Sequence, residues 1–483
     1  MRTARSLVIA AVLGAAVVGT SDRAEASGLY FSERGVRPLA RGGAFVAGAD
    51  DIGAIWHNPA GLADAGTTIL VDLAWLNYSA SFTRKTNVTD AGGTVRTYEY
   101  PTVNGSTPIL PIPTMGLSYA FGEKKQFTLA GGMLAPYTAI QSWPSTIPCT
   151  APQTGQCPSP SRYSLISLDG SLLLGPGLYF AWKPIEQLRL GIGLEALVGT
   201  FQSQVMFTAS PADRLLSAPE DPQYDTLGML KVGPIFAPSA NIGATVVPIP
   251  QLRFGVSGQL PYWVNAPGHV QTKLPTAAPF DNARQEGDSV WVKFRLPAVF
   301  RIGMEVRPVP QLRIEGAYVA EFWSLHDSID VVPTNLTLVG VTGFPSPFPV
   351  GRITLQRNFQ NASSFRLGGE YQLQLKGYGF DFRLGGNFDQ SAIPRNYLSP
   401  LTVDLDRFTV ALGVGLHIGD HWRFDATYAR VIGADADVDP ASASIQRVNP
   451  VHGYPTKVEA INGGHYWAGA NVLGVGLQYK FSP

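Results

Sequence analysis

The chain has 483 residues, in which 36 lysine and arginine residues balance 36 aspartate and glutamate residues. Charged residues make up only 15% of it, against about 25% in a typical soluble protein, while glycine and phenylalanine are abundant. The neutral balance, without a basic tail or stripe, argues against a nucleic-acid partner.

The first 26 residues predict a cleaved export signal. Arg2 and Arg5 form a basic start, residues 7–18 an apolar core, and Ala24-Glu25-Ala26 a cleavage site made of small residues. The apolar core falls short of the roughly 20 residues that a membrane-spanning helix needs. We therefore expect an exported protein whose mature chain begins near Ser27.

Residues 27–66 follow the signal and show no strand-like alternation. The segment contains Gly42-Gly43-Ala44, the acidic pair Asp50-Asp51 and the run Asn58-Pro59-Ala60-Gly61-Leu62. This composition predicts short helical turns separated by a proline break. Because so short a segment cannot bury a core of its own, we expect it to fold against something larger, such as the lumen of a barrel.

From Thr67 onward, apolar residues recur with a period of two, which indicates β-strands. Between Val290 and Val306 one face is wholly apolar and the other carries charges, which fits a strand with lipid outside and a polar lumen inside. We predict an all-β fold in which residues 67–483 form an antiparallel transmembrane barrel. About fourteen strands are expected, at 67–82, 112–121, 126–137, 166–182, 188–206, 236–246, 252–263, 289–306, 312–323, 363–374, 378–389, 405–418, 421–432 and 466–481.

Short turns alternate with long loops along this region. The sequence Pro-Ile-Glu-Gln-Leu-Arg at 184–189 recurs in related form at 248–253 and 308–313, each time between two strand patterns. Outer-membrane barrels have such short periplasmic turns and longer extracellular loops. Residues 336–341, within the long loop 324–362, could pair as an extra strand. The last strand ends on the aromatic Phe481, as is usual for outer-membrane proteins, so we expect that location.

The two cysteines, Cys149 and Cys157, lie close together in a polar loop. Export favours a disulfide between them, and no histidine or further cysteine stands at metal-ligand spacing. The seven histidines are scattered, without a nucleophile motif, and no phosphate loop or dinucleotide fingerprint is present. We therefore predict no metal, no cofactor and no enzymatic activity.

The segment at 41–62 resembles the N-terminal hatch of the FadL family, outer-membrane transporters of long-chain fatty acids and other hydrophobic compounds. Asn58-Pro59-Ala60-Gly61-Leu62 matches the most recognisable motif of that family, and the Gly/Ala-rich stretch and Asp50-Asp51 before it match as well. The resemblance is close over the hatch and architectural over the barrel. It implies a monomeric fourteen-stranded barrel, set in outer-membrane lipid and plugged by residues 27–66.

The resemblance also implies a passive route for a hydrophobic ligand. The ligand lands in an apolar groove among the extracellular loops, moves to a pocket in the lumen and leaves sideways where the third strand kinks inward, in contact with the hatch motif. On this basis the gate comprises Phe45, Trp56, Asn58, Pro59, Ala60, Gly61 and Leu62. The paired glycines and the proline of the third strand weaken ladder pairing, so the kink is expected at Gly131, Gly132, Met133 and Pro136.

Two further groups of residues are candidates for ligand contact. The landing groove is expected in the loop between the fifth and sixth strands, where apolar residues gather: Leu215, Leu216, Leu227, Met229, Leu230, Ile235 and Phe236. A carboxylate headgroup would need a cation in the lumen, and Lys293, Arg295 and the deeper Arg301 are the candidates. The other lumen charges, Glu305, Glu370, Arg313 and Arg383 among them, are expected to pair across the barrel.

Four alternatives remain open from the sequence. An importer of aromatic hydrocarbons with the same fold would have an apolar pocket without a headgroup cation. A general diffusion porin would have an open, charged constriction and no hatch. An outer-membrane enzyme such as a phospholipase would need a lipid-facing nucleophile with a histidine, and an adhesion barrel would need no plug.

Overall fold

The computed structural model describes residues 34–89, 92–108, 111–137, 141–150, 152–210, 220–451 and 460–481. The predicted export signal, residues 27–33 and the groove candidates Leu215 and Leu216 lie outside these ranges. Among the described helices, none is long and apolar enough to cross a membrane.

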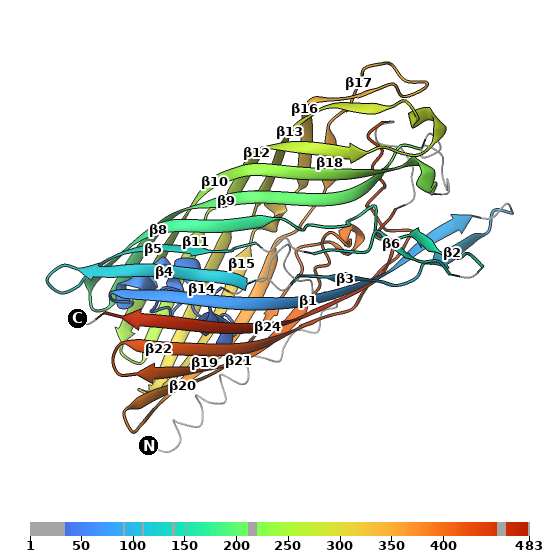
Figure 1. Ribbon diagram of the computed structural model, residues 1–483. Coiled ribbons are helices and arrows are strands. Elements are labelled where there is room, and N and C mark those ends of the chain that lie inside the picture. Colours follow the sequence, from blue (N-terminus) through green and yellow to red (C-terminus); the bar gives the residue numbers. More distant parts are fainter. Residues whose placement is uncertain are drawn as a thin grey trace.

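The described chain forms a closed antiparallel barrel of fourteen strands, which confirms the predicted fold class (Figure 1). The wall closes where the first strand pairs with the last over seventeen residue pairs, from Thr68–Lys480 to Arg84–Gly464. In chain order the wall strands are β1 (Thr68–Thr89), β4 (Pro111–Phe121), β5 (Phe127–Leu134), β8 (Leu172–Ile185), β9 (Leu188–Thr208), β10 (Asp225–Ile249), β11 (Leu252–Gln259) continued by β12 (Tyr262–Lys273), β13 (Arg284–Leu296) continued by β14 (Val299–Val309), β15 (Leu312–Glu321) continued by β16 (Ser328–Val339), β18 (Ile353–Gln356) continued by β19 (Ala362–Leu375), β20 (Tyr378–Asp389), β21 (Arg407–Ile418), β22 (Trp422–Gly433) and β24 (Gly464–Lys480).

Shorter elements decorate one end of the barrel. β2 (Val95–Glu99) and β3 (Val103–Ser106) pair with the far part of β1, and β17 (Phe348–Pro349) pairs with β16. β6 (Thr146–Pro148) and β7 (Gln156–Pro158) form a separate ribbon, bridged by a Cys149–Cys157 disulfide. The remaining short elements are β23 (Ala436–Val438), η3 (Pro222–Tyr224), η4 (Ala278–Phe280), η5 (Trp323–Leu325) and η6 (Arg395–Tyr397).

The two ends of the barrel differ in the length of their connections. At one end the strands are joined by tight turns, and the C-terminal strand β24 also ends there (Figure 1). Long connections and strand extensions occupy the other end. Because outer-membrane barrels place short turns in the periplasm, the long-loop end is the extracellular one. Around the barrel, large apolar side chains point outward and are exposed, as a lipid-facing surface requires, including Leu178, Leu194, Phe236, Ile242, Leu384 and Phe408.

The strand predicted at 289–306 is interrupted at Pro297-Ala298, and the interruption reverses which face its residues present. Leu296 and Val299 are both buried although they are three positions apart, so the residues that face the lumen change from even to odd numbers. A one-residue shift of this kind moves a whole set of side chains to the opposite face. The prediction that Lys293 and Arg295 face the lumen is therefore wrong, because both are exposed on the outside.

Neighbouring strands are interrupted at the same height. β11 stops before Leu260-Pro261, and β15 stops before η5, which separates it from β16. β12 pairs with β13 above the interruptions, whereas β11 pairs with β14 below them. Residues 336–339 belong to β16, which extends the wall position of β15 and pairs with β13. They therefore add no fifteenth wall strand.

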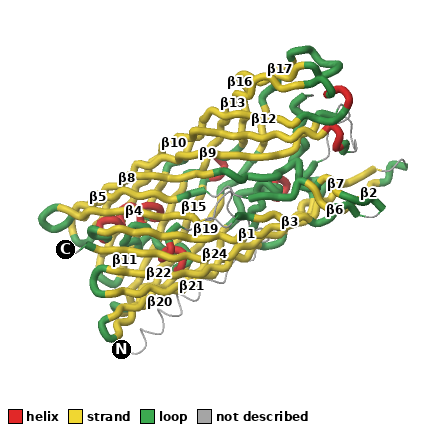
Figure 2. Tube along the Cα trace, viewed as in Figure 1, coloured by secondary structure: helices red, strands yellow, loops and turns green. Residues whose placement is uncertain are grey.

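Residues 34–66 lie inside the barrel near its periplasmic end, as short helices surrounded by strands (Figure 2). Their elements are α2 (Val36–Ala40), α3 (Ala54–His57) and η1 (Pro59–Asp64), and nearly all of their side chains are buried. Two wall glycines show how closely this backbone approaches the wall. A Cβ atom on Gly385 would lie 2.1 Å from the Arg41 carbonyl carbon, and one on Gly191 would lie 2.3 Å from the Ala60 nitrogen. We call residues 34–66 the hatch from here on.

Candidate functional site

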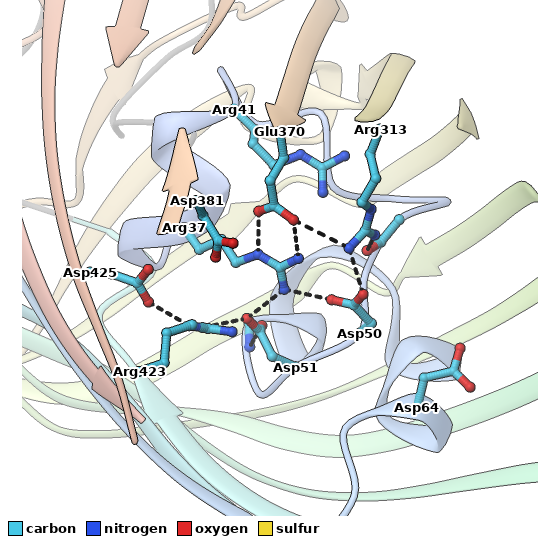
Figure 3. Close-up of polar contacts among 12 residues, drawn as sticks. Arg37, Arg41, Asp50, Asp51, Asp64, Arg313, Glu370, Asp381, Arg423 and Asp425 are labelled. Atoms are coloured by element: carbon cyan, nitrogen blue, oxygen red, sulfur yellow. Dashed lines mark hydrogen bonds and ion pairs between the residues drawn. The ribbon is translucent and has the colours of Figure 1, made fainter. Parts of the chain in front are cut away.

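Buried ion pairs anchor the first half of the hatch, with Arg37 at their centre (Figure 3). Its Nε and Nη2 atoms donate to the two oxygens of Glu370, each at 2.8 Å. Its Nη1 atom donates to Asp50 Oδ1 at 2.6 Å and to Asp51 Oδ2 at 3.1 Å. The acidic pair of the sequence motif is therefore the hatch's own counter-charge for Arg37.

The same network continues into the wall. Arg313 of β15 contacts Asp50 Oδ2 at 2.7 Å, and Arg383 of β20 contacts Glu370 Oε2 at 2.7 Å. Arg423 of β22 contacts Asp51 Oδ2 at 2.8 Å (Figure 3). Cations and carboxylates alternate, which confirms the expected pairing of lumen charges. Removal of one member would leave a buried charge uncompensated, at a cost of about 3–5 kcal/mol.

A second group of contacts holds the glycine-rich turn of the hatch. Arg41 Nη2 lies 3.1 Å from Glu305 Oε2 and 3.0 Å from Glu315 Oε2. The backbone amides of residues 46, 47 and 48 donate to the Glu315 carboxylate at 2.6, 2.8 and 3.0 Å. One wall carboxylate thus satisfies three buried donors that no regular secondary structure would pair.

Asn58 ties the hatch motif together and to the wall. Its Nδ2 atom donates to Val46 O at 2.8 Å and to Thr245 Oγ1 of β10 at 3.0 Å, and its Oδ1 atom accepts from Ala60 N at 3.1 Å. It is the N-cap of η1, with Pro59 at the first helical position. At that position the N–H that proline lacks would have no partner within the helix. We predicted that this corner abuts Gly131-Gly132. That is wrong, because it lies against Gly191 of β9 and Gly243 of β10, whereas Ile55 approaches Gly132.

The other gate candidates are buried aromatic residues that cations cover. The Trp56 ring lies 5.0 Å from the guanidinium carbon of Arg301, whose Nη2 atom also contacts Gln259 Oε1 at 3.4 Å. The Phe45 ring lies between Arg37 and Arg41, at 5.3 and 5.4 Å. Arg301 faces the lumen, as predicted, but its guanidinium stacks on the hatch. Lys293 and Arg295, in contrast, point outward.

The third wall strand, β5, is regular where a kink was predicted. Gly131 and Gly132 pair with β4 on one side and β8 on the other, without any register shift. The prediction that the kink lies at Gly131, Gly132 and Met133 is therefore wrong. The strand instead ends at Leu134, and the chain turns inward over Ala135, Pro136 and Tyr137, all of them buried.

The hatch holds this inward turn. Arg34 donates from Nε to Ala135 O at 2.6 Å and from Nη2 to Pro136 O. The Tyr137 ring packs edge-on against Tyr262, with ring centroids 6.2 Å apart. In a longer strand these two carbonyls would be free to accept from a neighbouring strand. Here both accept from an arginine of the hatch, so the chain after β5 is bonded to the hatch in the lumen.

A gap in the hydrogen-bond ladder results between β4 and β8. Ala135 N donates to Pro113 O at 3.3 Å, and the next described link above it joins Ser142 to Ser106, with two bonds of 2.9 Å. Within an antiparallel strand the nitrogen and oxygen of one residue face the same neighbour, so Pro111 and Pro113 both turn proline nitrogens toward the gap. Since proline has no N–H, this edge exposes fewer unpaired donors. We call the described residues 135–137, where the pairing of β5 has ended, the ladder gap.

An apolar cavity of about 190 Å³ lies inside the extracellular extension of the barrel. Phe201, Val205 and Phe207 of β9 line one side, and Ile329 and Val331 of β16 line another. A smaller cavity of about 60 Å³ adjoins it and shares Phe207 and Val331. Together they form an apolar track from the extracellular tip inward, which we call the upper cavity.

One arginine lines the upper cavity. Arg357 follows β18, is buried, and donates only its backbone amide, to Asp327 O at 2.7 Å. Its Nε atom is buried without a partner, and no ion pair or hydrogen bond of its guanidinium is found among the described residues. Burial alone lowers its pKa to about 10, so the group stays charged at neutral pH. An uncompensated buried charge is costly unless a partner arrives.

The groove candidates lie on a strand rather than in a loop, which corrects that prediction. Leu227, Met229, Leu230, Ile235 and Phe236 all belong to β10. Leu230 lines the upper cavity, Ile235 is buried in the core, and Phe236 points to lipid with 71% of its surface exposed. The strand was missed because Gly233-Pro234 interrupts the alternation. Arg357 was missed because its distinguishing property, a buried guanidinium with no partner in the described part of the chain, is visible only in the folded protein.

A family model described as outer membrane protein transport protein (OMPP1/FadL/TodX) matches residues 17–481. Among solved structures, a Pseudomonas aeruginosa FadL homologue matches with a TM-score of 0.68 and 14% identity, over 94% of this chain and all of that one. The Pseudomonas putida toluene transporter TodX matches at 0.60 and 12%, over 94% and 100%. The Ralstonia pickettii toluene transporter TbuX matches at 0.57 and 15%, over 93% and 99%. No curated protein matches the chain.

Proposed function

The chain belongs to the outer membrane transport protein family (OMPP1/FadL/TodX), and from this premise we propose that it takes up long-chain fatty acids or similar hydrophobic acids passively. It works as a monomer in outer-membrane lipid. The observation that carries the proposal is Arg357, a buried cation whose guanidinium has no partner among the described residues and which lies on the wall of an apolar cavity. An amphipathic acid would fill the cavity with its chain and supply the missing carboxylate.

The proposed route leads from the upper cavity to the ladder gap. The apolar lining of the two adjoining cavities favours entry from the extracellular tip. The ladder gap and the inward turn at Ala135–Tyr137 favour release through the side of the barrel, since the strand pairing of β5 ends at Leu134. The hatch, held by buried ion pairs, closes the straight route to the periplasm and argues against a general porin.

An importer of aromatic hydrocarbons is the second candidate, because two of the similar structures are named as toluene transporters. Toluene has no charge, so it would leave Arg357 without a partner. The acid is therefore the better fit to this chain. The proposal includes no enzymatic step.

Replacement of Arg357 by methionine tests the choice of ligand. We expect R357M to lower oleate uptake about tenfold or more, since a hydrogen bond to a charged group contributes about 1.5–3 kcal/mol, and to leave toluene uptake unchanged. R352M is the matched control, because Arg352 lies on the same segment but is exposed and paired with Asp330. Equal oleate uptake by R357M and R352M would overturn the headgroup assignment.

A tryptophan beside the inward turn tests lateral release. Gly175 of β8 faces inward, and a Cβ there would lie 3.5 Å from Pro136, so G175W would fill the space beside the ladder gap. We expect it to block uptake in a barrel that still inserts. In G131W, the control, the added ring would lie near Leu178 on the lipid face. If G175W transports as well as G131W, the ligand leaves by another route.

A further inference from the structure

The outward-facing residues of one wall position change character at the interruption around Pro297. Below it, on β14, Phe300, Ile302 and Met304 are exposed and apolar. Above it, on β13, the exposed residues are Arg295, Lys293 and Trp291. The change marks the outer edge of the lipid-facing band, since charged residues are costly inside the membrane and tolerated at its surface.

Two tryptophans stand at this edge. Trp263 of β12 is 56% exposed and lies directly opposite Arg295 in the strand register, and Trp291 is 41% exposed. Lys293 lies opposite Asn265, between them. Tryptophan is enriched at the membrane–water interface, so these rings place Lys293 and Arg295 at the level of the lipid headgroups.

The acidic residues on this outer face already contact other side chains. Glu286 pairs with Arg284 at 2.6 Å, and Asp288 lies 3.1 Å from His269. Asp330, opposite Lys293 in the register, is engaged by Arg352 and by Thr354 Oγ1 at 2.7 Å.

Lys293, Arg295 and Lys231 of β10 are left over. Within the ranges that the structure describes, none of the three has an ion-pair partner. Lys293 and Arg295 also project from the same face two residues apart, about 7 Å along the strand, where like charges repel unless an anion lies between them. We call Trp263, Trp291, Lys293 and Arg295 the basic edge.

We infer that the basic edge binds the phosphate groups of lipopolysaccharide in the outer leaflet. The two cations face outward, form no ion pair among the described residues and lie beside two interfacial tryptophans, which suits a phosphorylated glycolipid bound to the wall. Arginine matches a phosphate with paired N–H donors, and the tryptophans contact the sugar and the upper acyl chains. Lys231, higher on the neighbouring strand, adds to the positive potential. This site is separate from the uptake route and does not depend on its ligand.

The test is a titration of the purified full chain in nanodiscs with bis-phosphorylated lipid A. The variant K293Q/R295Q is compared with K124Q/K125Q, which removes two cations from the exposed periplasmic turn between β4 and β5. We expect the first variant to bind lipid A about tenfold more weakly and the second to bind like the wild type. Dephosphorylated lipid A should bind all three proteins equally and weakly.

Two outcomes would overturn the inference. Equal affinity of K293Q/R295Q and the wild type would show that the basic edge takes no part. An equal loss in K124Q/K125Q would show that net charge, rather than this place on the wall, governs binding. Heat-modifiable gel mobility, which reports a closed barrel, confirms that each variant is folded, and oleate uptake is scored separately so that the two proposals fail independently.

Discussion

The lumen contains two regions that treat buried arginine in opposite ways. Arg313, beside the hatch, and Arg357, in the upper cavity, are each 5% exposed. Arg313 contacts Asp50, Glu305 and Glu370, whereas Arg357 has no such partner among the described residues. The difference indicates that the hatch region stays closed because its charges pair with one another. The upper cavity, in contrast, has a cation that a ligand can pair with.

The largest expected effect is in the hatch region. Arg313→Met would leave three carboxylates short of a cation, so we expect the hatch to be destabilised by about 3–5 kcal/mol. Planar-bilayer recordings should then show frequent openings that the wild type lacks. R284M, which removes an exposed pair, should change stability by less than about 1 kcal/mol. An R313M protein that shows no channel openings and has wild-type stability would contradict the proposed difference between the two regions.

Asn58→Ala should have a smaller effect. The substitution removes an N-cap and the bonds to Val46 and Thr245, which together contribute about 2 kcal/mol. We expect slower uptake in a barrel that inserts normally. Asn87, a half-buried asparagine of β1 that accepts from Thr97 Oγ1, provides the control N87A. Wild-type uptake by N58A would show that the contacts of Asn58 are not needed for transport.

The smallest effect is a pH dependence near Arg357. Burial, with a contribution from the charge of Arg357, lowers the pKa of His326 to about 4. The unfolded chain therefore binds the proton more readily between about pH 6.5 and 4, so stability is complete above that window and falls as the pH drops through it. We expect a loss of about 1.4 kcal/mol from this residue at pH 5.5. Thermal unfolding at pH 7.5 and 5.5 should show less loss in H326Q, and an equal loss would contradict the assignment.

The sequence predicts the barrel well because lipid demands a strict alternation on every strand. Fourteen strands and their approximate bounds follow from it. The same alternation concealed the reversal at Pro297-Ala298. Below that point the outside is apolar and the lumen charged, as Phe300 and Arg301 show; above it the outside is charged and the lumen apolar, as Arg295 and Leu296 show. The two inversions cancel, so the pattern runs on unbroken and only the folded chain reveals the change.

The hatch motif likewise predicts a plug but not its contacts. Asn58-Pro59 identifies the segment, yet the motif does not indicate that Asn58 bonds to Thr245 of β10. The inward turn of the third strand is held by Arg34, which belongs to no recognisable motif. Such partners depend on which strands lie opposite one another across the lumen, a property of barrel closure and not of local sequence.

Thermal unfolding of R313M and R357M, each with and without oleate, tests the central claim most directly. Without ligand, we predict that R313M unfolds well below the wild type and R357M at or above it, because only the latter loses an uncompensated charge. Oleate should raise the unfolding temperature of the wild type and of R313M but not of R357M. An R357M protein that is as unstable as R313M, or that oleate stabilises as much as the wild type, would contradict the account.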